Sequence, residues 1–232
     1  MPVASESPTA ARLDWAELDL YRFFAFVFST PSLERFQKLA HPAIKDALAE
    51  LWRRLGCTGD FPELVWFDVY AEYEATYIAL FDVGIPEPPV PLFESAHDKT
   101  KPAQEIALEN TWFYGTLGLQ WDSRCAVPDY LITQLEFLAA VHYSLENAQD
   151  ADAGRSLARI ERDFLDRHVL NWLPTAAAKL NGVSPSALGI FLDLLVAYLH
   201  NRRDEVDRRS GCVARSGVIP HRSPLFPVIE HG

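Results

Sequence analysis

The stretch VPDYLITQLEFLAAVHY, residues 127–143, decides the fold class. Leucines recur in it at three- and four-residue spacing, which is the period of an amphipathic helix. Pro128 stands just ahead of this pattern, where the fixed φ of proline suits the start of a helix. The pattern therefore predicts a helix that packs a leucine face, with Leu131, Leu135 and Leu138, against a core.

The other side of this helix is chemically mixed. On a helical wheel Asp129, Thr133 and Glu136 fall opposite the leucines, and Tyr130 lies on one flank. Carboxylates beside aromatic rings suit a peptide that presents arginine, because a carboxylate pairs with the guanidinium group and a ring stacks on it. His142 lies on the leucine face, so we expect a hydrogen-bonded core histidine there rather than a metal ligand.

Helical periodicity extends from this stretch over most of the chain. No alternating pattern bounded by hairpin turns and no repeat of fixed period occurs, so the sequence predicts an all-α fold with a single globular helical domain. We expect a disordered lead over residues 1–13, an all-helical domain over 14–206, and a flexible or docked tail over 207–232. Expected helices begin at Asp14, which would cap the first one, and cover 30–40, 41–56, 61–81, 103–119, 152–180 and 184–206.

An aromatic stripe marks the predicted helix over 61–81. We interpret this stripe mainly as core packing, because aromatic side chains are readily buried and tyrosine hydroxyls can reach solvent at the edge of the core. It consists of Trp66, Tyr70, Tyr73, Tyr77 and Leu80.

The segment 82–102 is rich in proline and predicts a long loop, since proline removes a backbone donor and is excluded from helix interiors and central strands. Loops of about twenty residues in compact domains tend to be functional or disordered. The prolines are Pro86, Pro88, Pro89, Pro91 and Pro102.

Composition narrows the class of protein. The 232 residues include 32 acidic and 21 basic side chains, and the net charge of −11 disfavours nucleic-acid partners. Cys57, Cys125 and Cys212 are widely spaced, which indicates neither a disulfide framework nor a zinc site and suits a reducing compartment. No segment reaches the roughly 18 apolar residues of a membrane span, so we expect a soluble cytoplasmic protein without membrane insertion.

Motifs of several known enzyme classes are absent from the sequence. The sequence contains no Walker A loop, dinucleotide-binding glycine motif, nucleophile elbow or HExxH pair. One alternative remains open, a helical metal-dependent enzyme with a site around Glu94, His97 and Asp98, joined by His168. Bound metal in the purified protein would favour that alternative.

Four motifs resemble a known family. VPDYLITQLEFL resembles the Pro-Asp-His-Leu and Leu-Glu-Phe signature of the TorD/DmsD/NarJ redox-enzyme maturation chaperones. Three further segments occur in the order of that family, and the resemblance extends from about Leu20 to Leu199. They are YEATYIALFDVGIPEPPVPLFES, ENTWFYGTLGL and FLDRHVLNWLP.

The resemblance implies a non-enzymatic, all-helical chaperone that binds the twin-arginine leader or the body of a molybdoenzyme catalytic subunit. Such chaperones hold the client in the cytoplasm until its molybdopterin cofactor is inserted, and themselves need no cofactor or metal. Guanine nucleotide binding has been proposed for the family, but the chain lacks a glycine loop that would cradle phosphates. The family's binding positions carry over to Asp129, Tyr130 and Glu136.

A second patch implied by the resemblance lies in the proline-rich segment, at Phe93, Glu94 and Ser95. Glu72 is a further candidate partner for arginine, with a solvated helix position as the alternative. Tyr130 departs from the histidine that the family often has, so a proton-linked role is in doubt there.

Two further questions stay open from the sequence. The chain could be a monomer, or a dimer that swaps helices about residues 82–102. It could also be a structural subunit that remains in a mature redox complex, which size-exclusion of the native complex would test.

Overall fold

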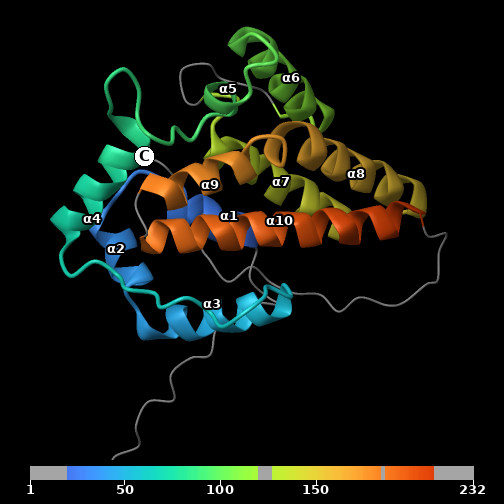
Figure 1. Cartoon of the computed structure of the whole chain (residues 1–232). Helices are drawn as coiled ribbons and strands as arrows, with labels where there is room; N and C mark the ends of the chain where they lie inside the picture. Colours follow the sequence, from blue (N-terminus) through green and yellow to red (C-terminus); the bar gives the residue numbers. More distant parts are fainter. Residues whose placement is uncertain (1–19, 120–126, 184–185, 212–232) are drawn as a thin grey trace, which may run out of the picture.

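The computed structural model describes residues 20–119, 127–183 and 186–211 (Figure 1). Within these ranges all regular elements are helices, and one isolated antiparallel bridge joins Phe93 to Tyr130. The all-α prediction is therefore confirmed. The helices are α1 (Leu20–Phe28), α2 (Leu33–Leu39), α3 (Pro42–Arg54), α4 (Tyr70–Tyr77), η1 (Ile78–Asp82), α5 (Glu94–His97), α6 (Ala103–Thr116), α7 (Leu131–Glu146), α8 (Ala151–Phe164), η2 (Leu165–Val169), α9 (Leu173–Val183) and α10 (Ala187–Gly211).

The core is built around α1 and α7. Helix α1 packs on α7, α8 packs on both α7 and α10, and α9 packs on α10 (Figure 1). Leu131, Leu135 and Leu138 are completely buried, which confirms the predicted leucine face. Each such side chain contributes about 1.5–3 kcal/mol through removal of its surface from water.

The solvent side predicted for the α7 stretch is only partly correct. Phe137 and Val141, which the helical wheel places on the same flank as Tyr130, are buried because α1 and α8 both pack on α7. The placement of Asp129 opposite the core is wrong, since this side chain is only 4% exposed. Asp129 precedes the first residue of α7, so the helical wheel does not describe its direction. Glu136 is exposed, as expected.

A buried ionic group joins four helices. The Arg202 guanidinium of α10 donates to Glu161 of α8 at 2.7 and 2.9 Å and to Nδ1 of His142 on α7 at 2.8 Å. Tyr21 of α1 donates to the same Glu161 carboxylate at 2.8 Å. Burial alone would lower the pKa of Arg202, but the hydrogen bonds and charge of Glu161 raise it above its ordinary value. The prediction of a hydrogen-bonded His142 is confirmed, although its side chain is only partly buried.

The long helix predicted over 61–81 is wrong in its first half. Helix α4 begins at Tyr70, and the residues from 61 to 69 form no helix. The ring of Trp66 lies 5.3 Å from that of Tyr73, and this packing outweighs the helical period of the sequence. Tyr73, Tyr77 and Leu80 of the stripe are buried, in agreement with core packing, and burial raises the pKa of Tyr73 to about 12.

The segment after η1 turns back on itself before α5. The backbone N–H of Val90 donates to the carbonyl of Leu80 at 2.9 Å, which ties the loop to η1. A Cβ atom on Gly84 would lie 2.1 Å from the Glu87 carbonyl oxygen, so this close approach requires glycine. The four-residue helix α5 lies inside the segment predicted as loop.

Other boundaries also differ from the sequence predictions. The helix expected over 152–180 is divided into α8, η2 and α9, and Trp172 is buried at the break. Helix α10 continues to Gly211, past the expected domain end at 206. The predicted lead over 1–13, the Asp14 cap and the tail beyond Gly211 lie outside the described residues.

Candidate functional site

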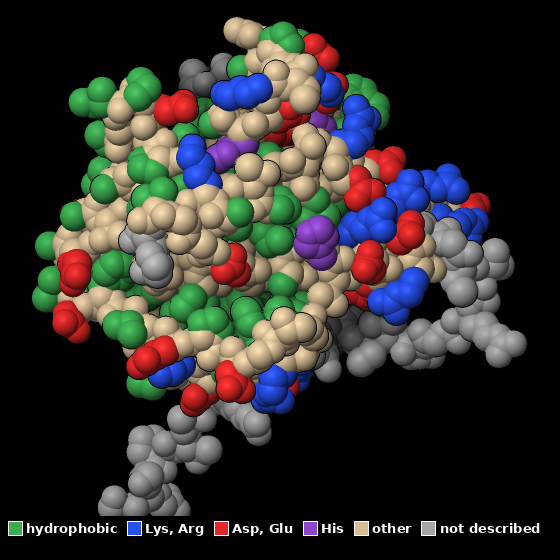
Figure 2. Space-filling model, in the orientation of Figure 1, with side chains coloured by type: hydrophobic (Ala, Val, Ile, Leu, Met, Phe, Trp, Pro, Cys, Tyr) green, Lys and Arg blue, Asp and Glu red, His purple; other side chains and the backbone are tan. Residues whose placement is uncertain are grey.

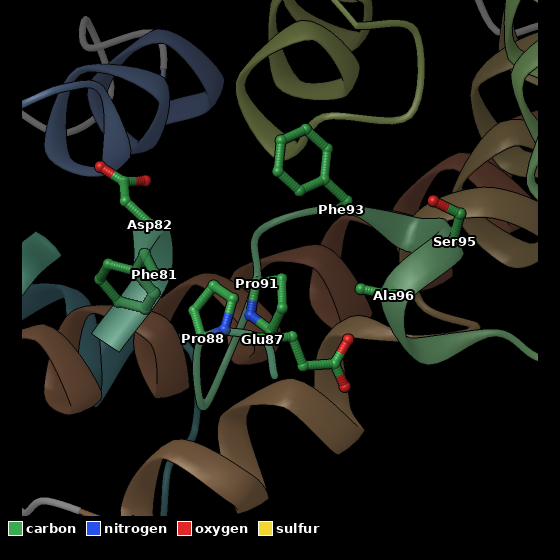
Figure 3. A pocket seen from close by; sticks show the side chains of 8 residues that line it. All are labelled: Phe81, Asp82, Glu87, Pro88, Pro91, Phe93, Ser95 and Ala96. Atoms are coloured by element: carbon green, nitrogen blue, oxygen red, sulfur yellow. The ribbon is translucent and has the colours of Figure 1, made fainter. Parts of the chain in front are cut away.

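A pocket of about 480 Å³ opens between η1, the loop that follows it and α5. Figure 3 shows Asp82 on the η1 side and Ser95 on the α5 side, with Glu87 on the loop between them. The floor and walls are largely apolar or aromatic. The lining residues are Phe81, Asp82, Glu87, Pro88, Pro91, Phe93, Ser95 and Ala96.

The charged side chains of this pocket are both acidic. Asp82 and Glu87 are exposed, and partial burial raises the pKa of Asp82 above its ordinary value. Hydrophobic side chains predominate over α4 and the following loop, whereas Lys and Arg lie together with Asp and Glu over the C-terminal part of α10 (Figure 2). This arrangement favours a cationic ligand that also carries apolar groups.

The entrance to α7 is joined to the segment that leads into α5. Leu131 donates its N–H to the Leu92 carbonyl at 2.9 Å, and Glu94 donates to the Asp129 carbonyl at 2.9 Å. The rings of Phe93 and Tyr130 stack with centroids 4.9 Å apart, and both side chains are half-buried. The two patches expected from the sequence, around residues 93–95 and 129–130, are therefore in direct contact.

Asp129 fixes the start of α5. Its Oδ2 atom accepts the backbone N–H of Ser95 at 3.0 Å. A buried carboxylate at this position satisfies a helix donor that would otherwise lack a partner. Asp129 thereby holds Ser95 in the wall of the pocket while its own carboxylate faces away from solvent.

Glu94 is the centre of a buried polar network behind the pocket. Its Oε2 atom accepts hydrogen bonds from Asn110 at 2.9 Å and Gln134 at 2.7 Å, and its Oε1 atom lies 3.0 Å from Nδ1 of His168. Glu94, Asn110, Gln134 and His168 are each at most 2% exposed. They come from α5, α6, α7 and η2, so the network fixes α5 to three other elements.

The residues of the metal-enzyme alternative have separate partners. Nε2 of His97 lies 2.7 Å from the Pro91 carbonyl, and its ring stacks on Trp172. Burial lowers the pKa of His97, and Nε2 donates to that carbonyl because a carbonyl oxygen can only accept. Asp98 accepts hydrogen bonds from Thr100 and Asn171. In the described part of the chain no group of three or more His, Cys, Asp or Glu side chains is arranged to hold a metal ion.

The predicted binding residues thus divide into three groups. Phe93 and Ser95 line the pocket, and Tyr130 stacks on Phe93. Asp129 and Glu94 are buried behind it. Glu136 on α7 and Glu72 in the first turn of α4 are exposed and lie outside its lining.

Sequence reasoning missed other residues of the pocket, notably Phe81, Asp82 and Glu87. The signal was present in the stretch FDVGIPEP, residues 81–88, where two carboxylates flank the first turn of the proline-rich segment. Nothing local in the sequence shows that this turn faces Phe93.

Comparison with known proteins places the chain in a family. The family model described as nitrate reductase delta subunit matches residues 39–178. No helix of the described ranges has the length and apolar character needed to cross a bilayer.

Three curated relatives share part of the sequence. The perchlorate reductase assembly chaperone protein of Dechloromonas aromatica (strain RCB) is 26% identical over 59% of this chain and 62% of its own length. The selenate reductase assembly chaperone protein of Thauera selenatis is 36% identical over 46% of this chain and 56% of its own. The chlorate reductase assembly chaperone protein of Ideonella dechloratans is 33% identical over 57% of this chain and 68% of its own length. The alignments thus span less than two thirds of the first two relatives.

A solved structure shows a weaker likeness. A crystal structure from Archaeoglobus fulgidus, of a protein assigned as a redox enzyme maturation protein, has a TM-score of 0.45 and 17% identity over 82% of this chain and 93% of its own. That score is too low to carry an argument. Because the family model covers more than half of the sequence, the chain belongs to the nitrate reductase delta subunit family.

Proposed function

We propose that this protein is a cytoplasmic chaperone for one molybdoenzyme catalytic subunit, that it binds the twin-arginine leader of that subunit, and that it does not act as an enzyme. The observation that carries the proposal is the pocket between η1 and α5, where the two charged lining residues are acidic and the remainder is largely apolar or aromatic. Family membership supports it, as do three relatives that are each named an assembly chaperone of a reductase.

The leader has two kinds of side chain that fit this pocket. Its arginines pair with Asp82 and Glu87, because a guanidinium group forms two parallel hydrogen bonds with a carboxylate. Its apolar side chains pack on Phe81 and Phe93 and on the prolines between them. Outside the pocket, Ile85 is fully exposed at the turn of the loop and extends the apolar surface.

Two of the residues expected to bind the peptide act in this proposal by positioning others. Asp129 holds the N-terminus of α5, and Glu94 fixes that helix to the protein interior. Direct contact of the leader with Tyr130 or Glu72 stays a prediction, and direct contact with Glu136 is kept as the competing assignment of the arginine site. Binding at the pocket keeps the client from the translocase until its molybdopterin cofactor has been inserted, and this chain contributes no cofactor of its own.

Calorimetric titration of the full-length protein with a synthetic twin-arginine leader tests the proposal. The matched control is the same leader with two lysines, which keeps the charge but loses the planar, two-point hydrogen bonding. We expect saturable binding that weakens with salt and with lysine. Equal binding of the two leaders, or no binding of either, would overturn the leader assignment.

A further inference from the structure

The pocket between η1 and α5, the leader pocket, carries negative charge and exposed apolar surface together. Burial is the only cause that raises the pKa of Asp82, so no cation of the described ranges offsets this carboxylate. Glu87 is exposed. Between these two carboxylates in the sequence, Val83 is 64% exposed and Ile85 is fully exposed. Apolar side chains of this size beside unpaired acidic groups favour contact with a segment that is both cationic and apolar.

The C-terminal segment of this chain has that chemistry. Residues 212–232 contain two arginines and one glutamate, so the segment is cationic in a protein whose net charge is −11. Within it the stretch HRSPLFPVIE, residues 221–230, places Arg222 three residues before Leu225 and four before Phe226. The N-terminal segment over 1–19 contains one arginine against four acidic residues, so an acidic pocket disfavours it.

The chain that follows α10 is long enough to reach the pocket. Helix α10 begins on the side of α4, because Phe191 packs on Trp66 and Trp66 packs on Tyr73, and it runs away from α4 (Figure 1). Its 25 residues span about 37 Å at 1.5 Å per residue. Leu225 follows Gly211 by 14 residues, which extend to about 46–50 Å. The segment therefore has the length to return along α10 to the pocket.

We propose that residues 221–230 of this chain occupy the leader pocket when no client is bound. Arg222 pairs with a carboxylate of the pocket, and Leu225 and Phe226 cover its apolar wall. The segment is an internal competitor that the client leader displaces, because a leader with two arginines pairs with both Asp82 and Glu87. This inference rests on the proposed function of the pocket and adds a control of its occupancy.

Competition by a tethered segment has a calculable size. A flexible linker of this kind gives the segment an effective concentration on the order of 1 mM at the pocket. With a dissociation constant of about 100 μM for the isolated segment, the apparent affinity of the leader falls about tenfold. Release of the segment should restore that factor.

Calorimetric titration of the full-length variant Arg222→Glu/Phe226→Ser with the twin-arginine leader tests the competition. We expect this tail variant to bind the leader about tenfold more tightly than wild type. The matched control is Arg208→Glu/Leu108→Ser, which makes similar changes at exposed positions of α10 and α6 and should bind as wild type. Equal leader affinity in wild type and in the tail variant would overturn the role of the segment as a competitor.

A second titration needs no leader and uses a synthetic peptide of residues 217–232. We expect saturable binding to the tail variant, binding about tenfold weaker to wild type, and none once Asp82→Asn/Glu87→Gln is added to the tail variant. Absence of peptide binding to the tail variant, or binding that persists without the two carboxylates, would overturn docking in this pocket.

The two titrations separate this inference from the proposed function. Peptide binding as expected, with no binding of the leader to any variant, would refute the leader assignment and leave the tail docking intact. Leader binding without peptide binding would do the reverse. A wild-type dimer in sedimentation that the tail variant lacks would overturn the intramolecular arrangement and assign the segment to the pocket of a second copy. Circular dichroism establishes that each variant is folded.

Discussion

Replacement of Glu94 by alanine should destabilise the protein by about 3–5 kcal/mol, because it removes a buried carboxylate that has three hydrogen-bond partners. The structure shows where this loss arises. In the variant the Asn110 amide keeps its hydrogen bond to the Ile106 carbonyl at 3.0 Å, and the Gln134 amide keeps its hydrogen bond to Oδ1 of Asn110 at 3.1 Å. Nδ1 of His168 loses its acceptor, and an unsatisfied buried donor costs about 1–3 kcal/mol. The lost charge-assisted bonds account for the remainder.

Urea unfolding followed by circular dichroism at neutral pH measures this change. The midpoint should fall, while the slope of the unfolding free energy against urea concentration stays constant. Asp60→Ala is the matched control, because that carboxylate is exposed in the turn after α3 and should change stability by less than about 0.5 kcal/mol. A Glu94→Ala variant within about 1 kcal/mol of wild type would refute the claim that the network fixes α5.

Three further perturbations follow from the same structure. Glu161→Ala leaves the buried Arg202 guanidinium with Glu205 as its remaining carboxylate partner, so unfolding should become easier by about 3 kcal/mol, and an unchanged urea midpoint would contradict this. Burial lowers the pKa of His97 below 6.5, so the unfolded state binds the proton more readily. Stability should fall as pH decreases below about 6.5, and it should fall less in His97→Phe. The contrary result is a urea midpoint that shifts equally in wild type and in His97→Phe between about pH 7.5 and 5.5. Gly84→Ala places a Cβ 2.1 Å from the Glu87 carbonyl oxygen and forces the turn to shift, so calorimetry should show weaker leader binding by the folded variant, and full affinity would argue against a role for this turn.

Local sequence rules identified most helices but not their ends. The α3 helix was predicted because Pro42 stands at its start and apolar residues recur at helical spacing, and these signals require no knowledge of the fold. The helix over 61–69 was predicted wrongly, because the Trp66 ring packs on Tyr73 and this tertiary contact leaves no trace in the periodicity. Period counts also cannot locate π-helical turns such as η1.

The candidate site was less predictable than the fold. Phe93 and Ser95 were identified through the family resemblance, and the structure shows them at the pocket. Gln134 is polar and yet fully buried, and Glu94, far away in sequence, accepts its hydrogen bond. A single sequence contains no signal for such a pairing, and the same limit hid Asp82 as a neighbour of Phe93.

The most direct test of the leader pocket is a comparison of neutralised carboxylates by calorimetry with the twin-arginine leader. The variant Asp82→Asn/Glu87→Gln removes both charges of the pocket, whereas Glu136→Gln removes one exposed charge outside its lining. The pocket assignment predicts that the double variant loses at least about tenfold in affinity and most of its salt dependence, while Glu136→Gln binds nearly as wild type. Wild-type affinity in the double variant, with loss in Glu136→Gln, would contradict it and move the arginine site to the outer surface of α7.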